Sequence, residues 1–303
     1  MKLSKNNMKA ILKYMLCGGA MLLMLSSCNE KIDPDWPGPG YIQNLKIKPL
    51  TANNNIVAHR GGASEANLPD NSIASLEYAI GLRCYASECD IYITADKKVI
   101  VAHADGKGQI NGLYPYEATY NEISNKGTLD NGEKIPLLED YLSAAVKRGS
   151  CTKVWLDIKK VTAPVFNPAH SISACKEACR IITDRGIQDW VEFICTGEEQ
   201  VIDACISMCH DAGINIAWMA GGNPDKYVAK GITWANISTD NINDLTSTAS
   251  YGISDYLEKG ISFSVFNIDK TDNYDVLNKK FGNRIKAICT NNPKKILEHI
   301  DKI

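Results

Sequence analysis

The chain lacks an excess of positive charge. Its 303 residues carry 33 Lys and Arg against 35 Asp and Glu, for a formal net charge of −2 at pH 7. Proteins that bind nucleic acids rely on clustered positive charge to pair with phosphate groups. The charge balance therefore argues against a nucleic-acid partner.

Long apolar runs are also absent beyond the N-terminal segment, so no later stretch approaches the roughly 20 apolar residues that a membrane-spanning helix needs. The apolar residues 14–25 follow four lysines and are too few to span a bilayer. This pattern is typical of a signal peptide. The residues Leu25-Ser26-Ser27-Cys28 resemble the bacterial lipobox, in which the cysteine is lipidated and becomes the new N-terminus.

The sequence thus predicts a lipoprotein signal peptide over residues 1–27. Lipid-anchored Cys28 would then hold the protein at a bacterial membrane in the cell envelope, on the periplasmic face or at the cell surface. An ordinary signal peptide with an incidental cysteine is the alternative. Residues 28–52 are polar and rich in Pro and Gly, which predicts a flexible tether. Residues 53–303 contain no second linker and are expected to form one domain.

The 11 cysteines do not follow the short, paired spacings of a disulfide framework, and most lie inside apolar runs. We therefore expect core thiols. Cys175 and Cys179, and likewise Cys205 and Cys209, are four residues apart on expected helices. This spacing is more typical of a buried helix face than of the alternative, a zinc site.

Short apolar runs alternate with amphipathic segments along the domain. The strand-like runs are residues 56–58, 89–94, 99–102, 154–158, 191–195, 214–219, 232–237, 261–266 and 285–289. Helical periodicity marks, among others, residues 72–81, 137–148, 170–185 and 199–212. Repeated strand–helix units predict an α/β fold with a parallel sheet. So many strands, spread evenly over about 250 residues, favour a (β/α)8 barrel.

One segment departs from a regular barrel. Between Asp90 and His103 there is no room for a helical crossover, which needs a dozen or more residues, so we expect a hairpin. A two-residue turn at Asp96-Lys97 would set Asp90 opposite His103, and a longer loop is the alternative. Residues 104–133 lack strong periodicity and are expected to form an insertion or lid, or else a surface-packed excursion.

Candidate site residues gather around these strands. Glu88 and Asp90 are two residues apart in a strand and project from one face, which suits a hard divalent cation. His59-Arg60-Gly61 follows the first strand, and His103 follows the third. Imidazoles relay protons near neutral pH, and guanidinium groups match phosphate oxygens. The set suggests metal-assisted phosphoryl chemistry.

Several motifs occur in a fixed order. They are His59-Arg60-Gly61-Gly62, Leu68-Pro69-Asp70-Asn71-Ser72, Glu88-Cys89-Asp90-Ile91, residues 94–103, 119–123 and 135–139, and Leu156-Asp157-Ile158-Lys159. They resemble, in turn, the H-R-G, P-E-N-[TS], E-x-D, T-x-D-x-x-x-V-x-x-H, T-Y-x-E-L, I-P-T-L-E and L-E-I-K motifs of glycerophosphodiester phosphodiesterases. Each motif alone is a weak signal, whereas the ordered series is a strong one.

The resemblance implies an irregular TIM barrel of the phospholipase-C-like phosphodiesterase type. It implies an enzyme that uses one divalent cation, Mg²⁺ or Ca²⁺, to hydrolyse glycerophosphodiesters to sn-glycerol 3-phosphate and an alcohol. Its site residues carry over as catalytic His59 and His103, metal ligands Glu88, Asp90 and Asp157, and phosphate- or substrate-binding Arg60 and Lys159. A plain internal ion pair between Asp157 and Lys159 is the alternative for that strand.

The chain departs from the family pattern at Asp70 and Asp157, where Glu is usual, at Ala104, where Asp is frequent, and at Ser264, where Trp is common. Asp157 is one methylene shorter than Glu, so its reach to an ion is in question. In the mechanism that we expect, the substrate's own 2-hydroxyl attacks phosphorus, and His59 and His103 share the acid and base roles. The alternatives are a phospholipase of the same fold and a non-catalytic binding lipoprotein.

Overall fold

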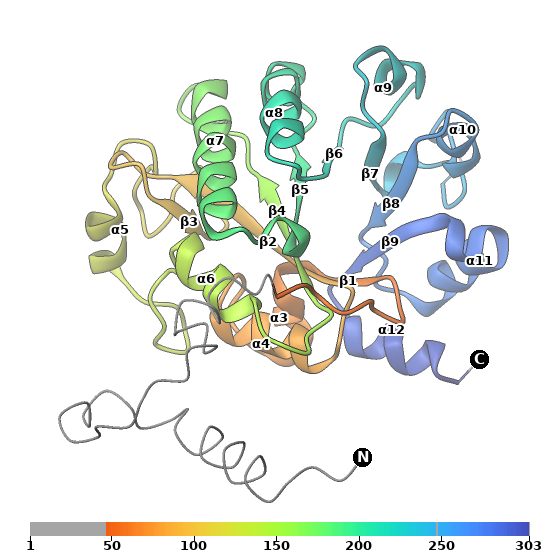
Figure 1. The fold of residues 1–303 in the computed structure, drawn as a ribbon, viewed down its shortest axis with the longest axis horizontal. Coiled ribbons are helices and arrows are strands. Elements are labelled where there is room, and N and C mark those ends of the chain that lie inside the picture. The colour runs from red at the N-terminus through yellow and green to blue at the C-terminus, as the bar shows by residue number, and fades with distance from the viewer. Residues whose placement is uncertain (1–46, 247, 303) are drawn as a thin grey trace, which may run out of the picture. The chain divides into compact units, whose positions relative to one another are not determined.

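The computed structural model describes residues 47–246 and 248–302, and in these ranges eight parallel strands close into a barrel (Figure 1). The barrel strands are β1 (Ile56–Ala58), β2 (Ala86–Ile93), β4 (Lys153–Ile158), β5 (Val191–Cys195), β6 (Ile216–Trp218), β7 (Trp234–Ser238), β8 (Ser262–Phe266) and β9 (Ile285–Thr290). The ring closes because β1 pairs with both β2 and β9. The predicted (β/α)8 barrel is confirmed.

Helices alternate with the barrel strands and surround them (Figure 1). They are α3 (Ala63–Ala66), α4 (Ile73–Gly81), α5 (Tyr120–Lys126), α6 (Leu138–Ala145), α7 (Pro168–Arg185), α8 (Glu199–Asp211), α9 (Asp225–Ala229), α10 (Ile253–Glu258), α11 (Thr271–Phe281) and α12 (Pro293–Ile300). Every strand and helix that the sequence predicts is present, with ends that differ by no more than three residues. The apolar side chains between helices and strands form the main core.

The hairpin between β2 and β3 (Val99–Val101) is the irregular part of the barrel. The two strands are antiparallel and pair Ile91 with Val101, so the N–H of Ala102 donates to the carbonyl of Asp90 at 3.0 Å. The two-residue turn was therefore the wrong prediction, and Asp90 faces Ala102 rather than His103. The alternative, a longer loop, is correct.

The reason for this register lies in the loop itself. The N–H of Thr94 donates to the carbonyl of Lys98, which leaves three residues in the loop, and Lys97 adopts a φ of +62°. The Thr94 hydroxyl donates to Asp96 at 2.6 Å and accepts from the N–H of Lys98 at 3.0 Å. These side-chain bonds stabilise the longer loop and shift the pairing by one residue.

The predicted insertion, residues 104–133, contains α5 and has a small core of its own. Ile110, Ala118 and Ile123 are buried together with side chains from the β2–β3 hairpin, among them Tyr92 and Ile100. The Thr119 hydroxyl and the Glu122 carboxylate cap the N-terminus of α5. The segment is thus an insertion that packs against the hairpin.

All nine cysteines within the described residues are buried and free, which agrees with the expected core thiols. The predicted signal peptide, Cys28 and the tether up to residue 46 lie outside the described residues. Among the helices that the structure describes, none is both long enough and apolar enough to cross a membrane.

Candidate active site

Three carboxylates meet where the β2 and β4 strands run side by side. Glu88 and Asp90 project from the same face of β2, and Asp90 pairs in register with Asp157 of β4. One oxygen atom from each of these three residues lies within 4.8 Å of the other two. Their exposed fractions are only 3%, 1% and 7%, respectively. The structure thus brings together the three predicted metal ligands.

Two cations partly neutralise this cluster. Lys159 Nζ lies 3.1 Å from Asp90 and 3.0 Å from Asp157, and the Arg60 guanidinium lies 3.1 Å from Asp90. Burial acts to raise the pKa of Asp90, but Lys159 and Arg60 outweigh it and hold that pKa below its usual value. The Asp157–Lys159 ion pair that was an alternative is therefore present, and it extends to Asp90.

Even with Lys159 and Arg60 beside it, the carboxylate cluster could accommodate a further positive charge. Burial and the negative charge of Asp90 raise the pKa of Glu88 to about 7. Burial also raises the pKa of Asp157, although Lys159 opposes it. Asp90 Oδ1 has only Lys159 Nζ beside it, at 3.1 Å, and Asp157 Oδ1 is buried without any partner. Three buried carboxylates close together, one with an unpartnered oxygen, form a donor set that suits Mg²⁺ or Ca²⁺.

His59 and Arg60 lie directly after β1, where the chain turns sharply. Arg60 adopts a φ of +49°, which directs its N–H to the Glu88 carboxylate at 2.9 Å and its guanidinium to Asp70 at 2.8 Å. The next residue, Gly61, has a φ of +82°, and a Cβ there would lie 2.5 Å from the backbone of Ser75. The glycine of the H-R-G motif is therefore required locally, because only glycine fits both the turn and the approach of α4.

A residue that the sequence analysis missed orients His59. Asn291, just after β9, donates its N–H and Nδ2 to the Asp269 carboxylate at 2.8 and 2.9 Å. Its Oδ1 therefore faces His59 Nδ1 at 2.7 Å and accepts a hydrogen bond from the Nδ1–H group. His59 Nε2 is left 3.8 Å from Glu88. The position of Asn291 after a barrel strand was the signal that could have identified it.

Asn71 performs a similar task for Asp90. Its Nδ2 donates to the Asp90 carboxylate at 2.9 Å, and its Oδ1 accepts from the Asp90 N–H at 3.0 Å. These two bonds fix the Asp90 side chain relative to its own strand. Asn71 lies within the P-E-N-like motif, next to Asp70, which the family resemblance already marked as unusual.

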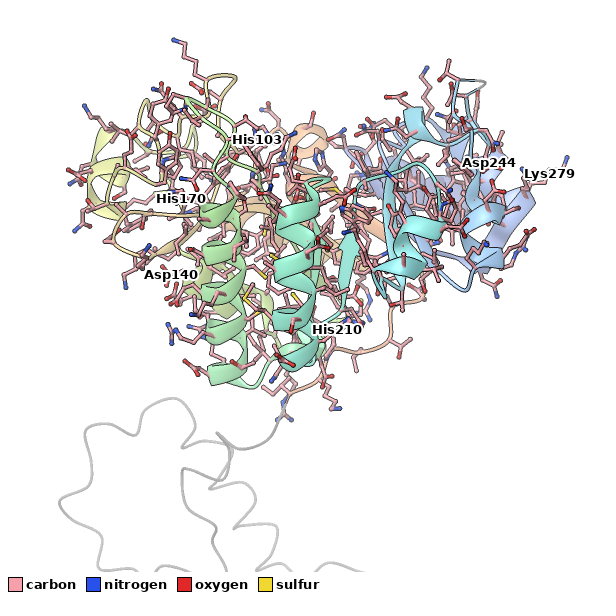
Figure 2. All side chains as sticks on the ribbon, turned by 90° about the horizontal axis from the view of Figure 1, so that it is seen from above. His103, Asp140, His170, His210, Asp244 and Lys279 are labelled. Atoms are coloured by element: carbon pink, nitrogen blue, oxygen red, sulfur yellow. The ribbon has the colours of Figure 1, made fainter. Side chains whose placement is uncertain are left out.

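His103 follows β3 and is exposed at the mouth of the barrel. Figure 2 shows it at the opposite end of the barrel from His210, which lies in the last turn of α8. Partial burial of the imidazole lowers the pKa of His103; the negative charge of Asp90 opposes this effect, and Arg60 and Lys159 add to it. Despite the shifted register, the charges of Asp90, Arg60 and Lys159 therefore all act on His103.

Ser264, one of the departures from the family pattern, does not reach this mouth. It is fully buried, its hydroxyl donates to Asn236 Oδ1 at 2.8 Å, and the Trp234 indole donates to it at 2.9 Å. The Ser264 side chain therefore makes its hydrogen bonds inside the barrel and does not line the mouth.

No family model matches the chain. Two Bacillus subtilis proteins align with part of it, the uncharacterised protein YqiK at 29% identity and the candidate glycerophosphodiester phosphodiesterase YhdW at 31% identity, each over 101 residues. Each alignment covers 31% of this chain and 41% of the relative, so the chain matches less than half the length of these curated proteins.

Solved structures match over far more of the chain. A glycerophosphodiester phosphodiesterase from Parabacteroides distasonis superposes with a TM-score of 0.68 and 22% identity, over 84% of this chain and 99% of that one. A phosphodiesterase from Oleispira antarctica, in complex with the product sn-glycerol-3-phosphate, gives a TM-score of 0.60 and 18% identity, over 82% and 97%. The chain therefore has the barrel fold of the solved glycerophosphodiester phosphodiesterases, as its motifs implied.

Proposed function

We propose that the chain is a metal-dependent phosphodiesterase that hydrolyses glycerophosphodiesters to sn-glycerol 3-phosphate and an alcohol. The observation that carries this proposal is the cluster of three buried carboxylates at the mouth of the barrel, with a buried Asp157 oxygen that lacks a partner and two histidines beside the cluster. The complex of the Oleispira neighbour with sn-glycerol-3-phosphate supports the same substrate class.

Glu88, Asp90 and Asp157 are the residues that would hold the cation. When bound, Mg²⁺ or Ca²⁺ would supply Lewis-acid polarisation of the phosphate and of the attacking hydroxyl. Arg60 has N–H groups besides those that face Asp70 and Asp90, and these can donate to the phosphate oxygens. Lys159, held by two carboxylates, would keep their charge balanced, and its predicted contact with substrate stays a prediction.

The histidines would divide the proton transfers. His103 has a lowered pKa, so it is neutral near pH 7 and can accept the proton of the substrate's 2-hydroxyl. His59 donates through Nδ1 to Asn291, which leaves Nε2, on the Glu88 side, for the leaving alcohol.

The chemical steps then balance. The 2-hydroxyl oxygen bonds to phosphorus as the bond from phosphorus to the alcohol breaks, and the alcohol leaves with the proton from His59. Water then opens the cyclic phosphate with the two histidine roles exchanged, which yields sn-glycerol 3-phosphate. Intramolecular attack benefits from proximity.

Assays of the purified protein on glycerophosphoethanolamine test the function. We expect release of sn-glycerol 3-phosphate that a chelator abolishes and that Mg²⁺ or Ca²⁺ restores. A diester that lacks the 2-hydroxyl should turn over on the order of a thousandfold more slowly. Hydrolysis of intact phospholipids alone would favour a phospholipase, and binding without turnover under either ion would refute the enzymatic proposal.

The histidine assignment has its own test. His59→Ala and His103→Ala should each lower turnover at least about a hundredfold. A substrate with a nitrophenol leaving group needs little protonation, so it should rescue His59→Ala and leave His103→Ala slow. Rescue of His103→Ala instead would reverse the two roles.

We also propose that this activity takes place at a bacterial membrane surface. The lipobox-like residues that end in Cys28 and the tether up to residue 52 support this location. Mass spectrometry of the mature N-terminus would identify diacylated Cys28, whereas cleavage at another residue would contradict the lipid anchor.

A further inference from the structure

Five of the nine described cysteines gather where α7 and α8 pack against each other beside β5. Cys175 and Cys179 are one turn apart on α7, and Cys205 and Cys209 are one turn apart on α8. Cys195 is the last residue of β5. Figure 2 shows sulfur atoms (yellow) beside these two helices. Two separate four-residue spacings, 30 residues apart in the sequence, thus converge on one place.

The distances between the thiols suit a single ion. Cys175 Sγ and Cys209 Sγ are 3.8 Å apart, and the Sγ atoms of Cys175, Cys179 and Cys209 all lie within 4.8 Å of one another. Cys205 lies one turn before Cys209 on the same helix and is not part of this group of three. Tetrahedral zinc, with Zn–S bonds of about 2.3 Å, places its thiolates about 3.8 Å apart. Three of the four thiols are therefore already near the positions of zinc ligands.

Packing alone does not require this convergence. A helical cysteine pair fills a buried face as two small apolar groups, and any small side chains on the facing helix would complete such a core. Here each helix instead presents thiols to the thiols of the other. All four are buried, with exposed fractions of 0% to 7%, among apolar residues. A site with four sulfur ligands and no access for substrate is typical of structural zinc.

We propose that Cys175, Cys179 and Cys209, with the Cys205 side chain turned toward them as the fourth ligand, form a closed tetrathiolate site for one structural zinc ion that ties α7 to α8. The site is separate from the carboxylate cluster. It also bears on the active site, because Ser171, in the first turn of α7, donates its hydroxyl to the carbonyl of Lys159 at 2.7 Å. Zinc would thus hold the helix that anchors Lys159.

Metal analysis of the full chain, purified with a reductant and without a chelator, tests the proposal. We expect about one zinc per chain that Cys179→Ala and Cys209→Ala each remove, with at least about a tenfold loss of bound zinc. Cys84→Ala is the matched control, since Cys84 is equally buried but lies in another cluster. Its zinc content should equal that of the unchanged chain.

A second measurement needs no substitution and so does not depend on the folding of a variant. The unchanged chain is refolded with Co²⁺, whose absorption bands with thiolate ligands do not arise from a carboxylate site. We expect these bands at about one Co²⁺ per chain, and we expect Zn²⁺ to displace them. Absence of the bands after refolding, or a disulfide between Cys175 and Cys209 in the purified protein, would overturn the proposal.

Discussion

The replacement of Glu88 by Gln tests whether the carboxylate cluster is built for a cation. Glu88 has a pKa of about 7 in the fold against an ordinary value of 4.5. Between these pH values the native state keeps a proton that the unfolded chain has released, so the metal-free protein loses stability as pH rises through this window. The full loss amounts to about 3 kcal/mol.

Glu88→Gln removes the ionisation and retains the shape. Its side-chain oxygen can still accept the Arg60 N–H that now bonds Glu88 at 2.9 Å. In a chelator, we expect the variant to exceed the unchanged protein in stability by up to about 3 kcal/mol at pH 8 and to match it near pH 4.5. Added Mg²⁺ or Ca²⁺ should stabilise the unchanged protein and have little effect on the variant. Urea unfolding at both pH values measures each quantity.

Glu192→Gln provides a matched control with the opposite sign. Burial would raise the pKa of Glu192, but Lys286 and Lys153 outweigh it and lower that pKa to about 2. This carboxylate stabilises the fold above its unfolded pKa, so its replacement should destabilise the protein at pH 8. If Glu88→Gln destabilised the metal-free protein at pH 8 as Glu192→Gln does, the reasoning that the site lacks a positive charge would be refuted.

Three further substitutions have defined outcomes. Asp157→Glu should be tolerated or should tighten cation binding in calorimetric titration, because it restores the longer carboxylate; complete loss of binding would mean that the site is built around Asp. Asn291→Ala should lower kcat about tenfold with cation affinity unchanged, since it frees His59 Nδ1; an unchanged kcat would contradict the positioning role. Gly61→Ala should cost about 2–4 kcal/mol in urea unfolding, because its Cβ would meet Ser75 at 2.5 Å; a neutral effect would contradict the close approach.

The strands were predictable because a parallel barrel buries them on both sides. A strand buried on both sides is a continuous run of apolar residues, such as residues 191–195 or 285–289. Such a run can be recognised from the local sequence, without knowing which strands it pairs with. The metal ligands were predictable for a related reason: carboxylates inside such runs cannot be explained by solvent exposure. Local sequence therefore sufficed for both.

The remaining features depend on contacts that local sequence does not record. The register of the hairpin followed from the side-chain bonds of Thr94 inside its loop. The role of Asn291 needed the closure of the barrel, which brings residues 59 and 291 together. The convergence of the cysteines on α7 and α8 likewise required the packing of two helices, and spacing within each helix could not show it.

The barrel contains two buried acidic centres, Glu192 and the cluster of Glu88, Asp90 and Asp157. Comparing them shows how a cation site differs from a buried carboxylate that the protein itself neutralises. Glu192 accepts from the Trp155 indole at 2.8 Å and the Tyr85 hydroxyl at 3.0 Å, and two lysines neutralise it. Both of its oxygens therefore have partners. At the mouth of the barrel, three carboxylates share two cations, and Asp157 retains a buried oxygen without a partner. The same fold satisfies one buried acid completely and leaves the other centre short of positive charge, which is the physical basis for assigning the cation to the mouth.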